Sequence, residues 1–387
     1  MYAVVVVAYN RPNETRRLID SILASDFCGD PVDLILSVDK GPRQEEVISA
    51  CEKIGWPHGE YRIIKRPEKM GLRPHILSCG ELTKEYDGII LLEDDLLVSP
   101  LFYRFAKGAM EFYRDDDRVA QISLYAYAVN EFVSRPFSPA KNELDVYAMQ
   151  VTQSWGECWT KSMWEHFARS EFYGASVCPS RKDLPQNVNK WKENSWKKNF
   201  TNYIVSEKKY VIYPYTSLTT NYTISGEHSR EEVADYHVVL QEGDPSFAFG
   251  ALDHCVKYDA FFERNDLDLR ALQLPDDARV CIDLYGTKSD FSDCDYILST
   301  NALPFQTLRE IALTLKPHEA NLSRTQEGKG ILLYDAKRPA KKPSVDPMVS
   351  IRYDVGPLRW RRSLMHGRRM GFLALQKRIK QFFKVKK

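Results

Sequence analysis

Three consecutive acidic residues, Glu93, Asp94 and Asp95, follow directly after the aliphatic run Gly88–Leu92. A buried strand that ends in carboxylates presents the oxygen ligands that a hard divalent cation prefers. Mg²⁺ or Mn²⁺ held by one or two carboxylates keeps positions open for a diphosphate and neutralises the charge of a leaving group. The alternative is a solvated acidic turn without a ligand. We favour the metal interpretation because other polar groups follow the neighbouring strands.

Two further polar segments stand in equivalent positions along the chain. Asn10-Arg11 follows the β-branched run Tyr2–Tyr9, and Asp39 follows the apolar run Asp33–Val38. Strand and helix patterns alternate over the first third of the chain, which predicts parallel βαβ units with right-handed crossovers. Because ligands of such sheets bind at the carboxyl ends of the strands, we expect these side chains and the acidic triplet to converge on one crevice.

The other hydrophobic patterns predict an α/β fold, with a mixed but mainly parallel Rossmann-like sheet and helices on both of its faces. A smaller α/β region follows at the C-terminal side. The patterns predict helices that begin near Pro12, Val47, Gly71 and Phe102, strands at Tyr61–Ile64, Val119–Leu124, Val280–Leu284, Tyr296–Ser299 and Ile331–Tyr334, and a helix at Leu308–Leu315.

Between about residues 140 and 230 the pattern is irregular and rich in tryptophan. Aromatic faces stack on the apolar faces of sugar rings, and Gly156 beside Trp155 lets the backbone approach a ligand closely. We therefore expect Trp155 and Gly156 to bind an acceptor. The alternative is that the five indoles of this segment belong to the hydrophobic core; they are Trp155, Trp159, Trp164, Trp191 and Trp196.

The composition excludes several classes of protein. Of the 387 residues 43% are hydrophobic, so the chain is not a disordered or low-complexity protein. The longest aliphatic runs, Ala3–Ala8 and Ile89–Leu92, are far shorter than the roughly 18 residues of a spanning helix. The N-terminus does not resemble a secretory signal, and the eight cysteines form no CxxC pair. These features predict a cytoplasmic protein with reduced thiols.

The total charge of +1 conceals an asymmetry between the body and the C-terminus of the chain. Residues 359–387 contain eleven lysines and arginines and no acid, with one apolar helical stripe at Phe372, Leu375, Ile379 and Phe382. A basic amphipathic helix of this kind is typical of proteins that lie on an anionic membrane surface. The alternatives are a disordered terminus or a segment that docks on the acidic body. No nucleic-acid-binding module accompanies it, so we expect no nucleic-acid partner.

Several segments together resemble a known group of enzymes. The ordered set is similar to the nucleotide-sugar-binding half of GT-A glycosyltransferases, in particular glycosyltransferase family 2-like bacterial sugar transferases and the N-acetylglucosaminyltransferase I type. The resemblance covers about residues 1–250. The segments that carry it are Val5–Pro12, Ser37–Gly41, Leu92–Leu96, Ser154–Trp159, Tyr213–Asn221 and Gly226–His228.

The resemblance implies a role for individual residues. Asp95 would contact a Mn²⁺ or Mg²⁺ ion, and His228 would complete the metal shell or touch the diphosphate. Many relatives have Asp-x-Asp where this chain has Glu93 at the first place, so the resemblance implies a metal site with one carboxylate. The residues expected to contact the nucleotide-sugar donor are Ala8, Tyr9, Arg11, Asp39, Arg73, Glu93 and Asp94.

An inverting transfer needs a carboxylate that deprotonates the acceptor hydroxyl. In the N-acetylglucosaminyltransferase I type this base belongs to an acidic pair beside a tryptophan. The nearest match here, Glu193–Trp196, has Asn194 and Ser195 where acids would be expected. The candidates for the base are therefore Glu227 and Glu157, ranked equally, with Glu193 third.

These observations together predict a metal-dependent, inverting glycosyltransferase on the inner face of the cell membrane. It would transfer a sugar from a nucleotide donor, most simply a UDP-sugar, to a glycan or lipid-linked glycan in surface-polysaccharide biosynthesis. One alternative is a non-catalytic glycan-binding or scaffold protein. Another is a nucleotidyltransferase, which would need a Gly-rich loop where Asn10–Glu14 has no glycine.

The sequence also predicts how the chain is divided. The expected parts are a GT-A domain at 1–250 (donor half 1–125, acceptor half 126–250), an extension at 251–338, a linker at 339–358 and the basic tail at 359–387.

Overall fold

The computed structural model divides into two compact units. The structure describes residues 1–222, 236–243, 246–356, 365, 367 and 368. The first unit comprises Met1–Asp266 with Thr287–Asp290, and the second comprises Leu267–Gly286 with the chain from Phe291 onward. The first unit thus continues beyond residue 250, where the sequence analysis placed the end of the GT-A domain.

Within the described residues, the first unit is organised around one nine-stranded sheet. Five of its strand pairs are parallel and three are antiparallel, which confirms the mixed, mainly parallel sheet expected from the sequence. In order across the sheet its strands are β13 (Lys257–Tyr258), β9 (Val146–Met149), β11 (Tyr210–Pro214), β6 (Val119–Ser123), β10 (Glu157–Thr160), β4 (Gly88–Glu93), β1 (Tyr2–Ala8), β2 (Val32–Val38) and β3 (Tyr61–Lys65).

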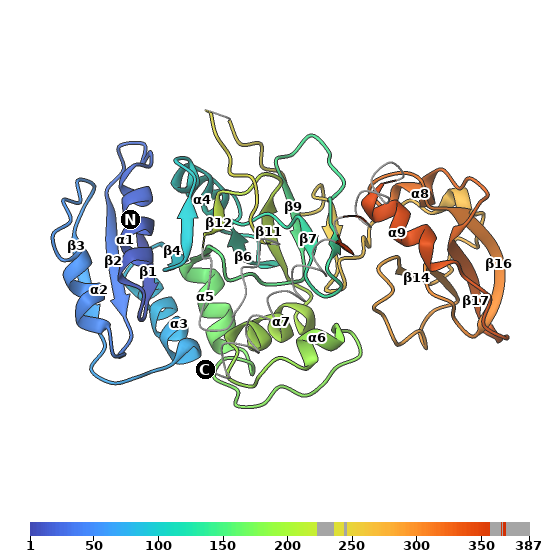
Figure 1. Ribbon diagram of the computed structural model, residues 1–387, viewed down its shortest axis with the longest axis horizontal. Helices are drawn as coiled ribbons and strands as arrows, with labels where there is room; N and C mark the ends of the chain where they lie inside the picture. Colours follow the sequence, from blue (N-terminus) through green and yellow to red (C-terminus); the bar gives the residue numbers. More distant parts are fainter. Residues whose placement is uncertain (223–235, 244–245, 357–364, 366, 369–387) are drawn as a thin grey trace. The chain divides into compact units, whose positions relative to one another are not determined.

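Three helices connect the parallel strands β1 to β4. They are α1 (Pro12–Leu23), α2 (Gln44–Cys51) and α3 (Leu72–Gly80), close to the helices expected from the sequence. The chain moves outward from β1 to β3 and returns to β4 on the other side of β1, so right-handed crossovers put α1 and α2 on one face and α3 on the opposite face. Figure 1 shows these elements together at the blue end of the first unit.

The strands form where the sequence has unbroken aliphatic runs. All seven residues of β1 and of β2 are buried, as expected for strands covered by helices on both faces. A short antiparallel pair, β5 (Leu96–Val98) with β12 (Thr219–Asn221), lies directly after the acidic triplet. The remaining elements of the first unit are α4 (Phe102–Phe112), β7 (Val129–Asn130), β8 (Arg135–Pro136), α5 (Lys161–Arg169), α6 (Gln186–Asn189) and α7 (Trp196–Ser206).

The second unit contains a four-stranded sheet in the order β14-β15-β17-β16, counted over its described residues. One face of this sheet buries a core that includes Leu298, Ile311 and Leu333. Its elements are β14 (Val280–Asp283), β15 (Tyr296–Ser299), β16 (Phe305–Ala312), α8 (Ala320–Ser323), β17 (Gly330–Pro339) and α9 (Pro347–Val355).

One expectation about the second unit is wrong: the segment Leu308–Leu315 is not a helix. Most of it belongs to β16, which pairs antiparallel with β17 at the edge of the sheet. Its apolar residues recur at helical spacing, yet Leu308 is 45% exposed while Ile311 is fully buried. Pairing with β17 therefore overrides the local pattern, as tertiary context commonly does for short apolar runs.

The segment expected as a linker, 339–358, contains the helix α9. Asp346 caps this helix by accepting a hydrogen bond from the amide of Met348 at 2.9 Å, and Pro347 occupies its first position. Tyr353 on α9 packs into the core of the second unit, and its hydroxyl donates to the carbonyl of Leu315 at 2.6 Å. The sequence analysis read the prolines as linker signals, whereas Pro347 starts a helix.

Two further findings concern the cysteines and membrane-spanning helices. All eight cysteines are free thiols. Among the described residues, no helix combines the length and apolarity needed to cross a membrane. Most of the basic tail 359–387 lies outside the described residues.

Candidate active site

The carboxyl ends of β4, β1 and β2 lie at the same level of the sheet. Val7 on β1 is paired with Glu93 on β4, and Ala8 with Val38 on β2. The amide of Asp39 donates to the carbonyl of Ala8 at 2.9 Å. The polar segments that follow these three strands are thus brought together at one edge, as the strand pattern predicts.

Arg11 bridges two residues of the acidic triplet. Its Nη1 donates to Oδ2 of Asp95 at 3.1 Å, and its Nη2 donates to Oδ1 of Asp94. The amide of Tyr9 also donates to Asp94, at 3.3 Å. The Asp94 side chain is only 4% exposed, whereas that of Arg11 is 28% exposed. One guanidinium is therefore shared by two carboxyl groups at the end of β1.

The carboxylates of the triplet remain crowded in spite of Arg11. Burial, together with the neighbouring Asp95 and Asp94, raises the pKa of Glu93 to about 8. Burial raises the pKa of Asp94 to about 6, although Arg11 acts in the opposite direction. The surroundings at this edge thus disfavour the ionised forms of Glu93 and Asp94, and pKa values perturbed in this way are typical of functional sites.

Asp39 and Tyr9 contact the loop that precedes α3. The two carboxylate oxygens of Asp39 accept hydrogen bonds from the amides of Met70 at 2.8 Å and Gly71 at 2.9 Å. The ammonium of Lys69 lies 5.3 Å from the centre of the Tyr9 ring. Asp39 is 3% exposed, so in this structure it holds the loop against the end of β2.

Arg73 does not reach the acidic triplet in this structure. Its guanidinium donates to the carbonyl of Glu193 at 2.8 Å and to that of Ala175. Glu193 in turn accepts from Lys198 and from the amide of Cys178. These contacts tie α3 to the segment before α7, and a contact of Arg73 with a donor stays a prediction.

Glu157 is the first residue of β10 and joins the acidic triplet from a different part of the chain. β10 pairs antiparallel with β4, with Glu157 opposite Leu91, two residues before Glu93. The Glu157 side chain is fully buried; its Oε2 accepts from the amide of Gly156 at 3.1 Å, and its Oε1 has no hydrogen-bond partner among the described residues. Burial and the nearby Glu93 hold the pKa of Glu157 well above its usual range.

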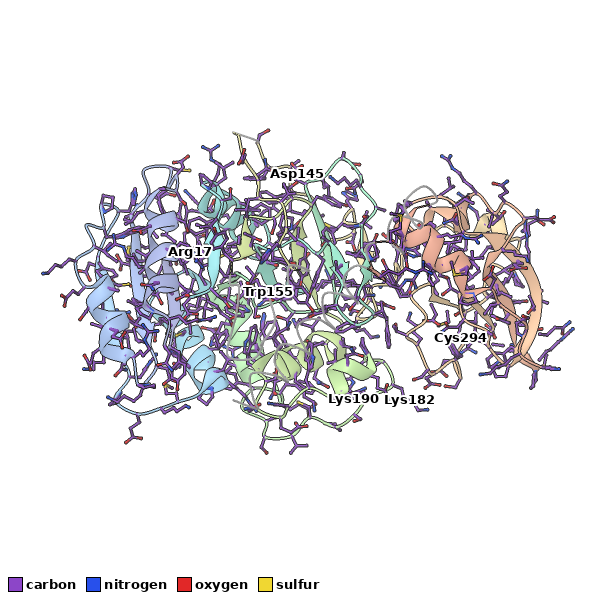
Figure 2. All side chains as sticks on the ribbon, in the orientation of Figure 1. Arg17, Asp145, Trp155, Lys182, Lys190 and Cys294 are labelled. Carbon is purple, nitrogen blue, oxygen red and sulfur yellow. The ribbon has the colours of Figure 1, made fainter. Side chains whose placement is uncertain are left out.

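The loop that carries Trp155 and Gly156 packs tightly beside Glu157. Gly156 has a positive φ of 103°, and a Cβ atom at this position would lie 2.9 Å from Cγ2 of Thr219. The ring of Trp155, labelled in Figure 2, lies 4.8 Å from the rings of both Tyr125 and Tyr236. Gly156 therefore serves close packing against β12, while Trp155 is partly exposed among aromatic neighbours.

Lys197 is a charged residue of this site that the sequence analysis did not identify. Its ammonium lies 3.8 Å from Oε1 of Glu131 and 5.0 Å from the centre of the Trp191 ring. Its charge also acts on Glu93 and Glu157, where it favours the ionised carboxylates. A lysine in a run of lysines looks like a solvated surface residue, so no local pattern could have singled it out.

Two of the expected site residues, Glu227 and His228, lie outside the described residues. The last described residue before them, Tyr222, donates its amide hydrogen to the carbonyl of Asp95 at 2.9 Å. Arg17 on α1, also labelled in Figure 2, lies 4.3 Å from the centre of the Tyr222 ring. The chain thus enters the segment of Glu227 and His228 directly beside the acidic triplet.

The carboxylate oxygens at this site suit a metal cation, although the protein supplies few ligands. Among the described positions, no three His, Cys, Asp or Glu side chains are grouped so that they could hold a metal ion by themselves. Arg11 nevertheless pairs with two carboxyl groups of this edge and the charge of Lys197 acts on two others, and one oxygen of Glu157 is buried without a partner in the described part of the chain. A divalent cation that takes further ligands from a bound diphosphate fits this set of oxygen ligands and would favour their ionised forms.

Comparisons with known proteins find partial structural likeness only. The sequence matches no protein-family model, and no curated protein sequence matches it. The mannosyltransferase PcManGT from Pyrobaculum calidifontis, in complex with GDP-Man and Mn²⁺, is 12% identical over 55% of this chain and 54% of its own, with a TM-score of 0.35. S. aureus TarS 1–349 in complex with UDP-GlcNAc is 11% identical over 59% and 60%, with a TM-score of 0.38. GalNAc-T7 with UDP, GalNAc and Mn²⁺ is 11% identical over 56% and 42%, with a TM-score of 0.41.

The chain spans about half the length of these solved structures. At such identities and TM-scores the function has to be inferred from the side chains of the site. The narrower resemblance to family 2-like enzymes and to the N-acetylglucosaminyltransferase I type stays a prediction.

Proposed function

We propose that this protein is a GT-A glycosyltransferase that moves a sugar from a nucleotide donor, preferably a UDP-sugar, onto a hydroxyl of a glycan or lipid-linked glycan. The observation that carries the proposal is the buried Glu157 carboxylate, one oxygen of which lacks a partner among the described residues, beside the acidic triplet. An acid held next to a cation-binding group at the carboxyl edge of a parallel sheet suits acid–base chemistry on a bound nucleotide.

The donor would bind at the ends of β1, β2 and β4. Asp95 would hold Mn²⁺ or Mg²⁺, with His228 as the further protein ligand, and the bound cation would neutralise the charge of the departing diphosphate. Arg11 is the cation already at this edge and suits phosphate oxygens, because a guanidinium donates two parallel hydrogen bonds. The groups expected against the nucleotide and its sugar are Ala8, Tyr9, Asp39, Arg73, Glu93 and Asp94.

Glu157 is our preferred base for the described part of the chain, with Glu227 as the alternative. A carboxylate whose pKa is raised by burial accepts a proton more readily than a solvated one, which suits it to deprotonate an attacking hydroxyl. We prefer inversion, in which the hydroxyl attacks the anomeric carbon from the face opposite the diphosphate. Trp155 would stack on the acceptor sugar, and Gly156 would keep the loop close to it.

The acceptor and the location follow from the charge of the C-terminal segment. A basic amphipathic segment at 359–387 would hold the enzyme on the inner face of the cell membrane, where lipid-linked glycans of surface-polysaccharide biosynthesis are exposed. Removing residues 359–387 should leave donor hydrolysis intact and weaken sedimentation with anionic liposomes. Unchanged sedimentation would discard the membrane role of this segment.

The test of the function is a panel of nucleotide sugars. Purified protein should be stabilised against heat by one of them in the presence of Mn²⁺, and should then hydrolyse or transfer from it. Asp95→Asn should abolish the reaction, whereas Asp20→Asn, on the exposed side of α1, should not. A panel in which no nucleotide sugar shows metal-dependent binding would favour the non-catalytic scaffold.

A further inference from the structure

Arg11 occupies the carboxylates that the proposed function assigns to the cation and the donor. Its two arms differ in their surroundings: Nη2 reaches Asp94, which is 4% exposed and is also held by the amide of Tyr9, and Nη1 reaches Asp95, which is 14% exposed. The Asp94 arm is thus anchored in the protein. The Asp95 arm reaches the more exposed of the two carboxyl groups.

The backbone of Arg11 is fixed independently of its side chain. Arg11 is the residue before the first turn of α1, and its carbonyl accepts from the amide of Thr15 at 2.9 Å and from the Thr15 hydroxyl at 2.7 Å. Pro12 then begins the helix. The guanidinium can therefore change partners without any rearrangement of β1 or α1.

We propose that Arg11 is an exchangeable counter-ion, a device that rests on the proposed function. In the donor-free protein its guanidinium pairs with both Asp94 and Asp95. A divalent cation that binds Asp95 displaces the Nη1 arm, and the displaced arm binds the diphosphate of the donor while the Nη2 arm stays on Asp94.

The exchange couples the binding of cation and nucleotide. Without nucleotide, the cation competes with a guanidinium for Asp95 and leaves that arm of Arg11 without an anion. With nucleotide, the diphosphate receives the freed arm, so each ligand strengthens the binding of the other to the same extent. This predicts weak metal binding by the protein alone and tighter binding together with a nucleoside diphosphate.

The test measures Mn²⁺ binding by the full chain, by electron paramagnetic resonance, with and without UDP. Arg11→Met should bind Mn²⁺ alone about tenfold more tightly than the natural protein, since coupling of this size is typical of linked sites. The improvement of Mn²⁺ binding by UDP should shrink by a similar factor, because the diphosphate still offers oxygen ligands to the ion but no longer receives the freed guanidinium. The matched control is Arg43→Met, which removes a cation that pairs with Glu46 instead of the triplet and should leave Mn²⁺ binding unchanged. Melting curves establish that each variant is folded.

Arg11→Lys provides a second variant if Arg11→Met does not fold. A lysine keeps the charge and can contact only one of the two carboxylates at a time, so about half of the UDP effect on Mn²⁺ binding, on a logarithmic scale, should remain. Unchanged or weaker Mn²⁺ binding by folded Arg11→Met overturns the exchange, and so does an absence of Mn²⁺ binding by every form. Tighter Mn²⁺ binding without turnover of any nucleotide sugar would support the exchange and overturn the glycosyltransferase.

Discussion

Buried polar side chains serve different ends in the two units. In the second unit the amide of Asn321 accepts from the backbone amides of Thr314 and Leu315, both at 2.8 Å. It also donates to the carbonyls of Leu315 and His318, both at 2.8 Å. A single buried side chain thus has four partners, and it closes the loop between β16 and α8.

At the carboxyl edge of the large sheet, by contrast, the polar groups lie in energetically unfavourable surroundings. The Glu157 carboxylate has one oxygen without a partner in the described structure, and the pKa values of Glu93 and Asp94 are raised. An unsatisfied buried polar group costs about 1–3 kcal/mol, a cost that a protein bears where a ligand supplies the missing partner. The comparison teaches that the hydrogen bonds of Asn321 are satisfied within the fold, whereas Glu157 leaves one oxygen for the ligand that we propose.

The largest expected effect is that of Glu157→Gln on the reaction. Removing the base should lower kcat by about 10³-fold while donor binding remains, because proton transfer by a positioned acid or base is worth 10²–10⁴-fold. Burial in the folded state raises the pKa of Glu157. Ionisation of this carboxyl group therefore destabilises the folded protein once the pH rises above the usual pKa of a glutamate. In urea unfolding at pH 8, Glu157→Gln should therefore be at least as stable as the natural protein. A stable variant with unchanged kcat would pass the role of base to Glu227.

Asn321→Ala should show the opposite behaviour. The loss of four hydrogen bonds, at about 1 kcal/mol each, should lower the free energy of unfolding of the second unit by about 4 kcal/mol. Donor hydrolysis by the folded fraction should not change. Asn301→Ala is the matched control, since the exposed side-chain amide of Asn301 donates a single hydrogen bond among the described residues, to the carbonyl of Gly286. A loss of hydrolysis with unaltered stability would break the comparison.

His75 on α3 tests a buried polar group of the first unit whose hydrogen bond is made. Its Nε2 lies 2.7 Å from the Ser37 hydroxyl, and burial lowers its pKa from 6.5 to about 4. The His75 side chain of the unfolded chain binds a proton more tightly than that of the folded protein. His75 therefore adds about 3 kcal/mol of stability above pH 6.5, and this contribution is lost as the pH falls toward 4. In urea unfolding at pH 7 and pH 4.5, His75→Gln should lose less stability between the two values than the natural protein. The exposed His254, changed to glutamine, should leave the difference as it is.

The smallest expected effect is that of Lys197→Met. Lys197 favours the ionised forms of Glu93 and Glu157, so its loss should lower kcat about tenfold at neutral pH, the equivalent of one pKa unit, with little change in KM. Lys197→Arg should restore most of the rate. Lys192→Met, in the exposed loop before α7, should have no effect. Equal losses from both methionine variants would mean that only the general positive charge matters.

Part of the site could be predicted from the sequence because it depends on local patterns. The aliphatic runs before Arg11, Asp39 and Glu93 form β1, β2 and β4, and the parallel βαβ connections bring their carboxyl ends together. The sequence analysis did not predict helix α9 and strand β16, because both depend on contacts with residues that are distant in the sequence. Pro347 is typical of a linker, but in the structure it begins the helix that carries Tyr353, which packs into the core of the second unit.

The sequence by itself determined the parallel strands β1, β2 and β4 and the polar residues at their carboxyl ends, because aliphatic runs and the handedness of βαβ units are local properties. Only the tertiary structure decided that β10 inserts antiparallel between β4 and β6 and thereby buries Glu157 beside the triplet. It also decided that Lys197 faces those acids and that Arg11 rests on Asp94 and Asp95. The register between distant segments depends on packing across the whole sheet, which no short stretch of sequence encodes.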